Sequence, residues 1–446
     1  MSSAGVSAAA RKGPGRDRPV EPCGLVVFGA SGSLARDRLG PALGELRRRR
    51  LLPEGFFVLG FGRASLEASR IPGLAPGLEN VHYLQGDYAA RASYEALKLQ
   101  LQILANRYDT RGNLLFYLAV PAFLYPTILM LLDQTGLLEK DWGGWSRVIV
   151  EKPFGRDADA AAALDAQLRC HVEESQLFRM DHVLGRETLR DVLTLRTANA
   201  LFEPVWNRDR IDHVQISVLE TAGIADRGAY YGSAGVLRDM FQETMFQLLA
   251  MIAMEPPPSL APEAIRDEIV KLFRSLKPWD DAADGHGAVL GQYSGCRDEA
   301  GSADASVTPT YAAIRLEIDN WRWRGIPFYL RSGKCLKQAA IEVSVAFKPA
   351  FPAGVGSDSL ILKLAPIPGL GLTLPARQPG APDGAGALDL DLDWASIFSS
   401  PPLPAYPDRL HDCLLGDLTT FQRRDALDET WRWLAPLLNS GRTPCT

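Results

Sequence analysis

The apolar and polar positions of the first 170 residues alternate between short apolar runs and longer amphipathic stretches. The apolar runs predict strands at residues 24–28, 56–61, 81–84, 114–120 and 147–150. The amphipathic stretches predict helices at 93–106, 123–135 and 158–170, with another helix starting near Leu34. Strands and helices that alternate in this way indicate a parallel, doubly wound α/β sheet. Ligands of such sheets bind at the carboxyl ends of the strands.

The pattern changes after about residue 212. Residues 213–220, 312–318, 327–330 and 341–347 read as strands, and no helix is expected between the later ones. This arrangement predicts an α+β domain with a large, mainly antiparallel sheet. The apolar stretch 237–254 predicts a helix that carries Asp239, Glu243 and Thr244. Residues 280–305 read as a loop and 349–389 as irregular, whereas 409–438 read as mainly helical.

Length and composition divide the chain into three parts. A length of 446 residues is enough for more than one domain. We expect a disordered tail at residues 1–22, a Rossmann-type domain at 23–195, and an α+β substrate-binding and oligomerisation domain at 196–446. The basic tail also has a composition found in organelle transit peptides, but its Ser, Ala, Pro and Gly content favours disorder.

Charge and cysteine content narrow the choice of partners and compartment. The net charge of −5 argues against a nucleic-acid or anionic-membrane partner. The apolar run at 114–132 is divided by Pro121 and Pro126, so a strand followed by a helix explains it better than a membrane span. No two of the six cysteines have metal-ligand spacing, which favours a reduced, cytoplasmic protein without a metal site.

A glycine-containing turn follows the first predicted strand. Glycines in this position let a backbone approach a pyrophosphate closely, and the helix that follows offers free N–H groups. Only two glycines are present, so a tight structural turn would look the same. The candidate cofactor-binding residues of this turn are Gly29, Ala30, Ser31, Gly32, Ser33 and Leu34.

Arg63 follows the second predicted strand, where NAD-selective proteins usually carry an acidic residue. A cation at this position suits the 2′-phosphate of NADP. The alternative is an ordinary surface arginine.

The stretch from Phe178 to Glu187 combines acidic, basic and imidazole groups with apolar neighbours. His182 and Arg186 are four residues apart, so on a helical turn they would share a face and could together bind a phosphate. A solvated turn with a chance histidine is the alternative.

Five motifs, taken in order, resemble the glucose-6-phosphate dehydrogenase family over roughly residues 24–347 and more weakly over 403–438. They begin at Val27, Ile149, Phe178, Trp206 and Phe328 and read VFGASGSL, IVEKPFGRD, FRMDHVLGRE, WNRD and FYLRSGK. The resemblance implies oxidation of glucose 6-phosphate at C1 with NADP as the hydride acceptor, in the pentose phosphate pathway. It also implies a homodimer or homotetramer.

The resemblance assigns roles to individual residues. Arg63 would bind the 2′-phosphate, and Tyr125 would contact the nicotinamide side. Lys152 would bridge cofactor and sugar, although a capping lysine is the structural alternative. His182 and Arg186 would bind the sugar phosphate. The sugar hydroxyls would contact Lys152, Glu220, Asp239 and Lys334.

The sequence departs from the family pattern at several of these positions. Ser33 stands where the family usually has an aspartate, Val183 replaces a tyrosine, and Arg186 replaces a lysine. Ala339 and Ala340 replace expected basic residues, which puts a second, structural NADP site in doubt.

The largest departure concerns the catalytic base. Thr244 stands at the position of the family's histidine base, which the aspartate matched by Asp181 would orient, and Glu243 replaces the neighbouring asparagine. A threonine hydroxyl cannot hold a proton near neutral pH, and loss of a positioned base costs roughly 10²–10⁴ in rate. Three functions therefore remain open. The protein could be a working dehydrogenase in which Glu243, Asp181 or a water is the base, a weak or inactive member that binds NADP or sugar phosphate, or a dehydrogenase for a different sugar phosphate.

Overall fold

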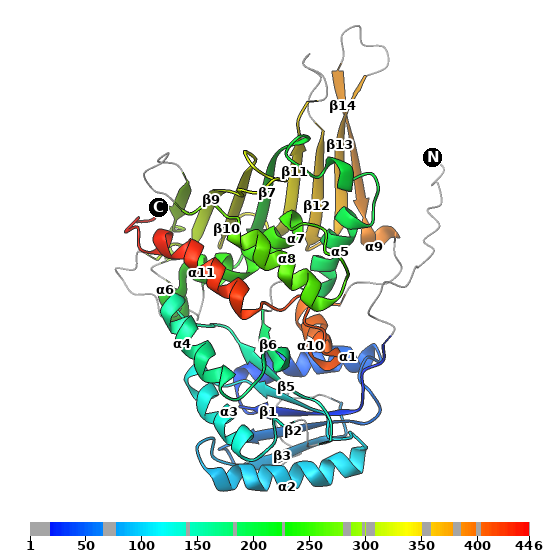
Figure 1. The fold of residues 1–446 in the computed structure, drawn as a ribbon, viewed down its shortest axis with the longest axis vertical. Coiled ribbons are helices and arrows are strands. Elements are labelled where there is room, and N and C mark those ends of the chain that lie inside the picture. The colour runs from blue at the N-terminus through cyan, green and yellow to red at the C-terminus, as the bar shows by residue number, and fades with distance from the viewer. Residues whose placement is uncertain are drawn as a thin grey trace.

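The computed structural model contains two sheets stacked end to end, each with its own helices (Figure 1). It describes residues 18–65, 77–139, 143–181, 185–224, 228–279, 287–296, 299, 308–349, 358–377, 385–397 and 403–445. Most of the predicted tail therefore lies outside the described residues, as does most of the predicted loop at 280–305.

The first sheet is parallel, with six strands in the order β3-β2-β1-β4-β5-β6. Its central strands are apolar on both faces, as expected for a sheet covered on both sides. The order reverses between β1 and β4, which makes this edge the switch point where doubly wound sheets bind ligands. The strands are β1 (Cys23–Phe28), β2 (Phe56–Gly62), β3 (Val81–Gln85), β4 (Leu114–Leu118), β5 (Ser146–Glu151) and β6 (Leu177–Met180).

Two apolar cores cover the faces of this sheet. One contains side chains of α2 (Arg91–Tyr108), α3 (Tyr125–Gln134) and α4 (Ala158–Arg169). The other contains α1 (Gly40–Arg48), the π-helical segment before it, and α10 (Ala405–Leu415), which comes from the far end of the chain. The expected strands and helices are confirmed to within a few residues, and the parallel doubly wound sheet is confirmed.

The second sheet has eight strands in the order β14-β13-β12-β11-β7-β10-β9-β8. Every neighbouring pair is antiparallel except β7 and β10, which run parallel. The prediction of a mainly antiparallel sheet is therefore confirmed. The strands are β7 (Ile211–Leu219), β8 (Ala288–Gly291), β9 (Tyr311–Glu317), β10 (Pro327–Gly333), β11 (Ala340–Phe347), β12 (Ser359–Ala365), β13 (Gly369–Arg377) and β14 (Ala385–Asp393).

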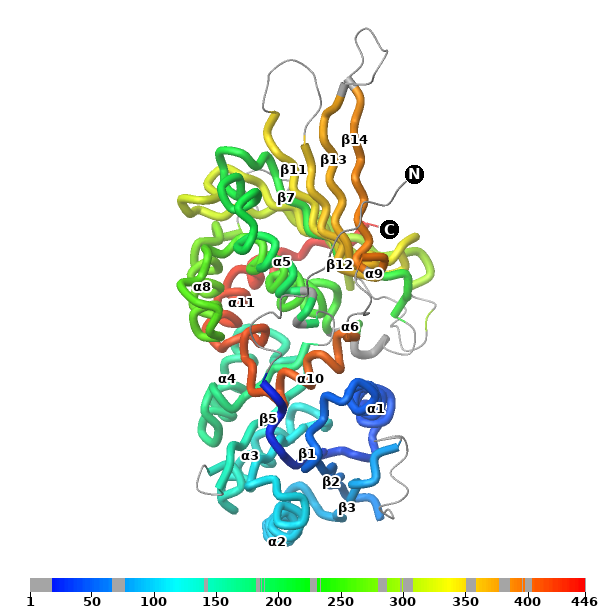
Figure 2. Tube along the Cα trace, turned by 90° about the vertical axis from the view of Figure 1, so that its right-hand side faces the viewer, coloured from blue at the N-terminus to red at the C-terminus, as the bar shows by residue number. Residues whose placement is uncertain are grey.

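Helices cover one face of this second sheet (Figures 1 and 2). They bury a continuous apolar core that also includes the inward side chains of the strands. The helices are α5 (Arg186–Thr197), α6 (Gly228–Val236), α7 (Phe246–Ala253), α8 (Pro262–Arg274) and α11 (Arg424–Leu438), with a π-helical segment (Leu237–Met245) joining α6 to α7. The predicted helix at 237–254 and the helical character of 409–438 are confirmed.

Two local predictions were wrong. Residues 349–389 contain β12, β13 and the start of β14, because alternating leucines such as Leu360 and Leu362 face the helices despite the nearby Pro and Gly. A short strand, β8, lies inside the predicted loop at 280–305. Gly185 is extended and α5 begins at Arg186, whereas positions 182–184, which the shared face of His182 and Arg186 also requires, lie outside the described residues.

Candidate active site

The glycine turn lies at the carboxyl end of β1, beside the end of β4. Gly29 has a φ of +82°, and a Cβ there would lie 2.3 Å from the carbonyl oxygen of Ala119. Only glycine therefore fits, because a side chain would collide with the backbone of the next strand. The amide of Gly32 donates to the Gly29 carbonyl at 2.9 Å, and a helix begins immediately after the turn. This geometry fits a dinucleotide pyrophosphate.

Arg63 is exposed directly after β2, the strand beside β1. Its guanidinium carbon lies 5.9 Å from the ring centre of Tyr88. This position after the second strand is where doubly wound sheets contact the ribose of a dinucleotide, and the cofactor role of Arg63 stays a prediction.

Lys152 follows β5 and occupies the centre of a buried polar cluster. Its Nζ lies 3.0 Å from Asp181 Oδ1 and 3.0 Å from Glu243 Oε2. Thr244 is fully buried, and its hydroxyl donates to Asp181 Oδ2 at 2.9 Å. The first sheet supplies Lys152 and Asp181, while the π-helical segment of the second domain supplies Glu243 and Thr244. The cluster therefore joins the two domains.

Burial and mutual charge set the proton affinities in this cluster. Burial raises the pKa of the Glu243 carboxyl to about 7, and the Lys152 ammonium only partly offsets that effect. Burial by itself would lower the pKa of Lys152, but Asp181 and Glu243 outweigh it and raise this pKa. Lys152 is thus held as an ammonium, and Glu243 is the carboxyl that changes protonation near neutral pH.

A second polar pair lies at the end of β10. Lys334 Nζ contacts Glu220 Oε2 at 2.6 Å and lies 5.4 Å from the ring centre of Tyr231. Burial raises the pKa of Tyr231, and the charges of Asp239 and Glu220 raise it further, so the phenol stays neutral. Asp239 comes from the same π-helical segment as Glu243. The structure therefore brings Glu220, Asp239 and Lys334 toward one another.

The predicted phosphate-binding residues cannot be placed in the same way. His182 lies outside the described residues, and the side chain of Arg186 is not described. Arg186 is the first residue of α5, after the extended Gly185. Their phosphate-binding role stays a prediction.

Tyr125 is buried behind the cleft. Its hydroxyl lies 3.3 Å from both the amide nitrogen and the carbonyl oxygen of Glu151, the residue before Lys152. This side chain therefore supports the backbone that carries Lys152, and its contact with the cofactor stays a prediction.

The sequence did not predict a buried hydrogen-bond network around Glu151. The hydroxyl of Tyr117 donates to Glu151 Oε1 at 2.5 Å, and that of Tyr406 donates to the same oxygen at 3.1 Å. The two phenols also contact each other. Burial raises the pKa of Glu151 to about 7. The hydrogen bonds from the two phenols lower this pKa and so offset part of the rise. The only signal in the sequence was a glutamate at the end of an apolar strand. Its partner Tyr406 lies 255 positions further along the chain, so no local pattern could connect the two.

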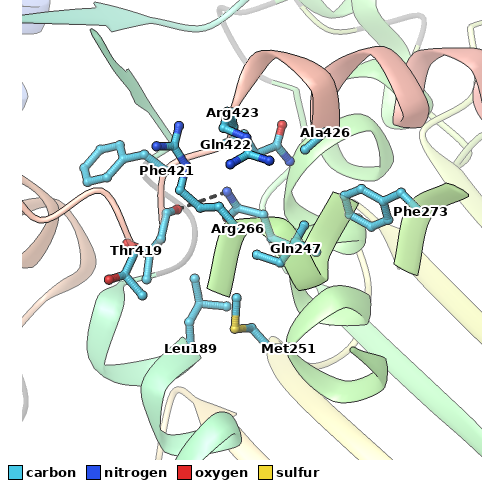
Figure 3. Close-up of a pocket in the computed structure, with 12 residues that line it drawn as sticks. Leu189, Gln247, Met251, Arg266, Phe273, Thr419, Phe421, Gln422, Arg423 and Ala426 are labelled. Carbon is cyan, nitrogen blue, oxygen red and sulfur yellow. Dashed lines mark hydrogen bonds between the residues drawn. The ribbon is translucent and has the colours of Figure 1, made fainter. Parts of the chain in front are cut away.

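Figure 3 shows a separate cavity between the helices of the second domain. Apolar side chains such as Leu189, Met251 and Phe273 line much of it. Gln247 spans one wall and donates to the carbonyl of Thr420 at 3.2 Å. The site residues named above do not line this cavity, so we do not assign substrate to it.

Neither a membrane-spanning helix nor a metal-binding cluster is found among the described residues. None of the described helices is both long and apolar enough to cross a membrane. Among the same residues, no group of three or more His, Cys, Asp or Glu side chains could hold a metal ion.

Comparisons with known proteins agree with the two-domain arrangement. Residues 26–191 match the family model of the glucose-6-phosphate dehydrogenase NAD binding domain, and residues 193–444 match that of the C-terminal domain. The glucose-6-phosphate 1-dehydrogenase of Aggregatibacter actinomycetemcomitans is 38% identical, covering 94% of this chain and 91% of its own. A cytoplasmic form from Arabidopsis thaliana is 35% identical, covering 93% and 85%.

Solved structures give the same result. A glucose-6-phosphate dehydrogenase in complex with its substrate glucose 6-phosphate superposes with a TM-score of 0.87 at 30% identity, covering 95% of this chain and 94% of that one. The enzyme from Mycobacterium avium gives 0.84 at 32% identity, covering 96% and 93%. Because the matches span both sheets and the cluster between them, the chain belongs to the glucose-6-phosphate dehydrogenase family.

Proposed function

We propose that this protein oxidises glucose 6-phosphate at C1 to 6-phosphogluconolactone with NADP, in the cytoplasm, and with Glu243 as the general base. Family membership over nearly the whole chain supports the reaction. We assign cofactor binding to residues 23–195, and substrate binding and assembly into a homodimer or homotetramer to residues 196–446.

Binding would divide between the two sides of the cleft. The glycine turn and Arg63 would hold the cofactor's phosphates, with Tyr125 and Lys152 on the nicotinamide side. His182 and Arg186 would bind the sugar phosphate, and Lys152, Glu220, Asp239 and Lys334 the sugar hydroxyls. Arg63 supports NADP over NAD because a cation there favours a 2′-phosphate.

The reaction removes a hydride from C1 and a proton from the C1 hydroxyl, so that a C1=O bond forms. NADP, when bound, supplies the acceptor for the hydride. The chain must supply the base for the proton. The observation that supports Glu243 is its buried carboxylate, which lies 3.0 Å from Lys152 beside Asp181. A carboxyl with a pKa of about 7 suits proton transfer near neutral pH.

The neighbouring groups are less suited to this role. Both oxygens of Asp181 already have partners, Lys152 at Oδ1 and Thr244 at Oδ2. Thr244 uses its hydroxyl proton in that bond and is too weak a base to accept another. We assign Asp181 and Thr244 to holding the Lys152 ammonium in place.

A weak or inactive binding protein is the second candidate. It is favoured by the Thr244 bond to Asp181, because this bond occupies the carboxylate that would otherwise orient an imidazole. Purified protein should be assayed with NADP or NAD against glucose 6-phosphate and a panel of other sugar phosphates. We expect NADPH formation with glucose 6-phosphate at a typical enzyme rate of about 1–10³ per second. Binding of NADP and glucose 6-phosphate without turnover would support the second candidate. Faster turnover of another sugar phosphate would reassign the substrate.

A further inference from the structure

We propose that helix α10 is a brace in which Tyr406 and Asp408 act as positioning residues, Tyr406 for Lys152 and Asp408 for the first turn of α5. The inference rests on the proposed function and adds to it residues that do not touch the substrate. Figures 1 and 2 show α10 at the junction of the two sheets.

The first arm of the brace runs from α10 to Lys152. Tyr406 is buried and donates to Glu151 Oε1 at 3.1 Å, and Tyr117 of β4 shares that oxygen. In the described part of the chain, Glu151 has no salt bridge, and both phenols bind its Oε1. On its main chain, Glu151 is bound by the hydroxyl of Tyr125. The residue before Lys152 is therefore fixed through both its side chain and its backbone, and little freedom remains for the lysine stem.

The second arm runs from α10 to the start of α5. Asp408, which is buried, accepts a bond from the amide of Glu187 at 2.9 Å. The side chain of Glu187 in turn accepts from the amide of Leu403, just before α10, also at 2.9 Å. These reciprocal bonds fix the backbone of the first turn of α5, where the predicted phosphate-binding residue Arg186 lies.

A third set of contacts anchors the helix itself. Arg147 of β5 donates to the carbonyl oxygens of Cys413 at 3.0 Å and Leu414 at 2.6 Å, in the last turn of α10. Such a cation satisfies carbonyls that a helix end leaves without partners. Apolar residues of α10, including Leu410, pack into the core shared with the helix that follows the glycine turn. One helix near the end of the chain thus contacts three of the segments that carry candidate site residues.

The two arms predict different kinetic defects. Tyr406→Phe removes one hydroxyl and should lower kcat about tenfold while raising KM for glucose 6-phosphate only about threefold, because a misplaced catalytic group costs more in rate than in binding. Asp408→Ala should raise that KM about tenfold with little change in kcat, since it loosens ground-state binding. Tyr108→Phe is a matched control, because its hydroxyl contacts His82 at 3.0 Å in the first domain and is not bonded to Glu151 or α10. An unchanged KM in Asp408→Ala would overturn the second arm.

A double-mutant cycle with Lys152→Ala separates positioning from general destabilisation. If Tyr406 acts through Lys152, Tyr406→Phe should change kcat less than about twofold once Lys152 is absent. An equal fold loss in both backgrounds would overturn the first arm. Glu151→Gln keeps an acceptor for both phenols and should retain most activity, whereas Glu151→Ala should lose it. Equal activity of these two variants would also contradict the proposal.

Failure of the proposed function would give a separate result. If the wild type binds glucose 6-phosphate but does not oxidise it, the proposed catalytic activity is refuted, whereas the proposed positioning role of α10 is not. The same four proteins of the cycle would then be titrated with glucose 6-phosphate by calorimetry. Tyr406→Phe should weaken binding only when Lys152 is present, and equal weakening in both backgrounds would overturn the brace.

Discussion

Replacing Glu243 by Gln tests the assignment of the base most directly. The change keeps the size of a buried side chain but removes its ability to accept and release a proton, together with its ion pair to Lys152. If Glu243 takes the proton from the C1 hydroxyl, kcat should fall by about 10²–10⁴, the contribution of a positioned general base. The wild-type rate should also decline as pH falls below about 7, because protonation of Glu243 removes the base.

The same substitution should change the pH dependence of stability in a defined direction. Burial raises the pKa of Glu243 from 4.5 to about 7 in the folded state. Between these values the folded protein holds a proton that the unfolded chain has released, so stability is lost as pH rises through this window. The shift corresponds to about 3 kcal/mol at pH 8. Glu243→Gln should lack this loss, so its free energy of unfolding relative to wild type should increase from pH 5 to pH 8. Glu151, with a pKa also raised to about 7, is common to both proteins and cancels in the difference.

Two measurements decide the outcome. Stopped-flow or steady-state detection of NADPH at pH 8 gives kcat, and urea unfolding at pH 5 and pH 8 gives the stability difference. A kcat within about threefold of wild type would refute Glu243 as the base, because no general base can be removed at so small a cost. In that event Asp181→Asn should be tested next. If the stability difference does not change with pH, the carboxyl does not titrate as its burial requires.

Three further predictions concern the cofactor, the substrate phosphate and the missing histidine. Arg63→Ala should weaken NADP binding in calorimetry and leave NAD binding nearly unchanged, and equal losses would show that Arg63 is structural. His182→Ala should weaken glucose 6-phosphate binding by roughly 1.5–3 kcal/mol, the range for a hydrogen bond to a charged group, with little effect on the binding of free glucose. A loss of the same size for both sugars would show that His182 does not bind the phosphate. Thr244→His should raise kcat only when combined with Glu243→Asn, because Thr244 is fully buried and a larger side chain there costs about 1–3 kcal/mol of strain. If the double variant is no faster than wild type, the position does not limit proton transfer.

Local patterns were sufficient for much of the fold. The apolar strand ending at Phe28, the glycine turn and the following helix were predictable because each depends on residues close in sequence. The strands at 359–393 were missed because Pro and Gly nearby outweighed the leucine alternation. Their extended conformation is stabilised by neighbouring strands, and a strand outside a sheet has no partner for its backbone groups.

The sequence by itself determined the family, the sheet types and the identity of the side chains at most candidate positions. It also showed that Thr244 cannot be the family's base. Only the tertiary structure placed Glu243 against Lys152, and Tyr406 against Glu151, because these pairs are far apart along the chain and meet only when the two sheets pack together. The raised pKa of Glu243 likewise arises from burial between the domains, and a sequence carries no direct record of which charges lose contact with water.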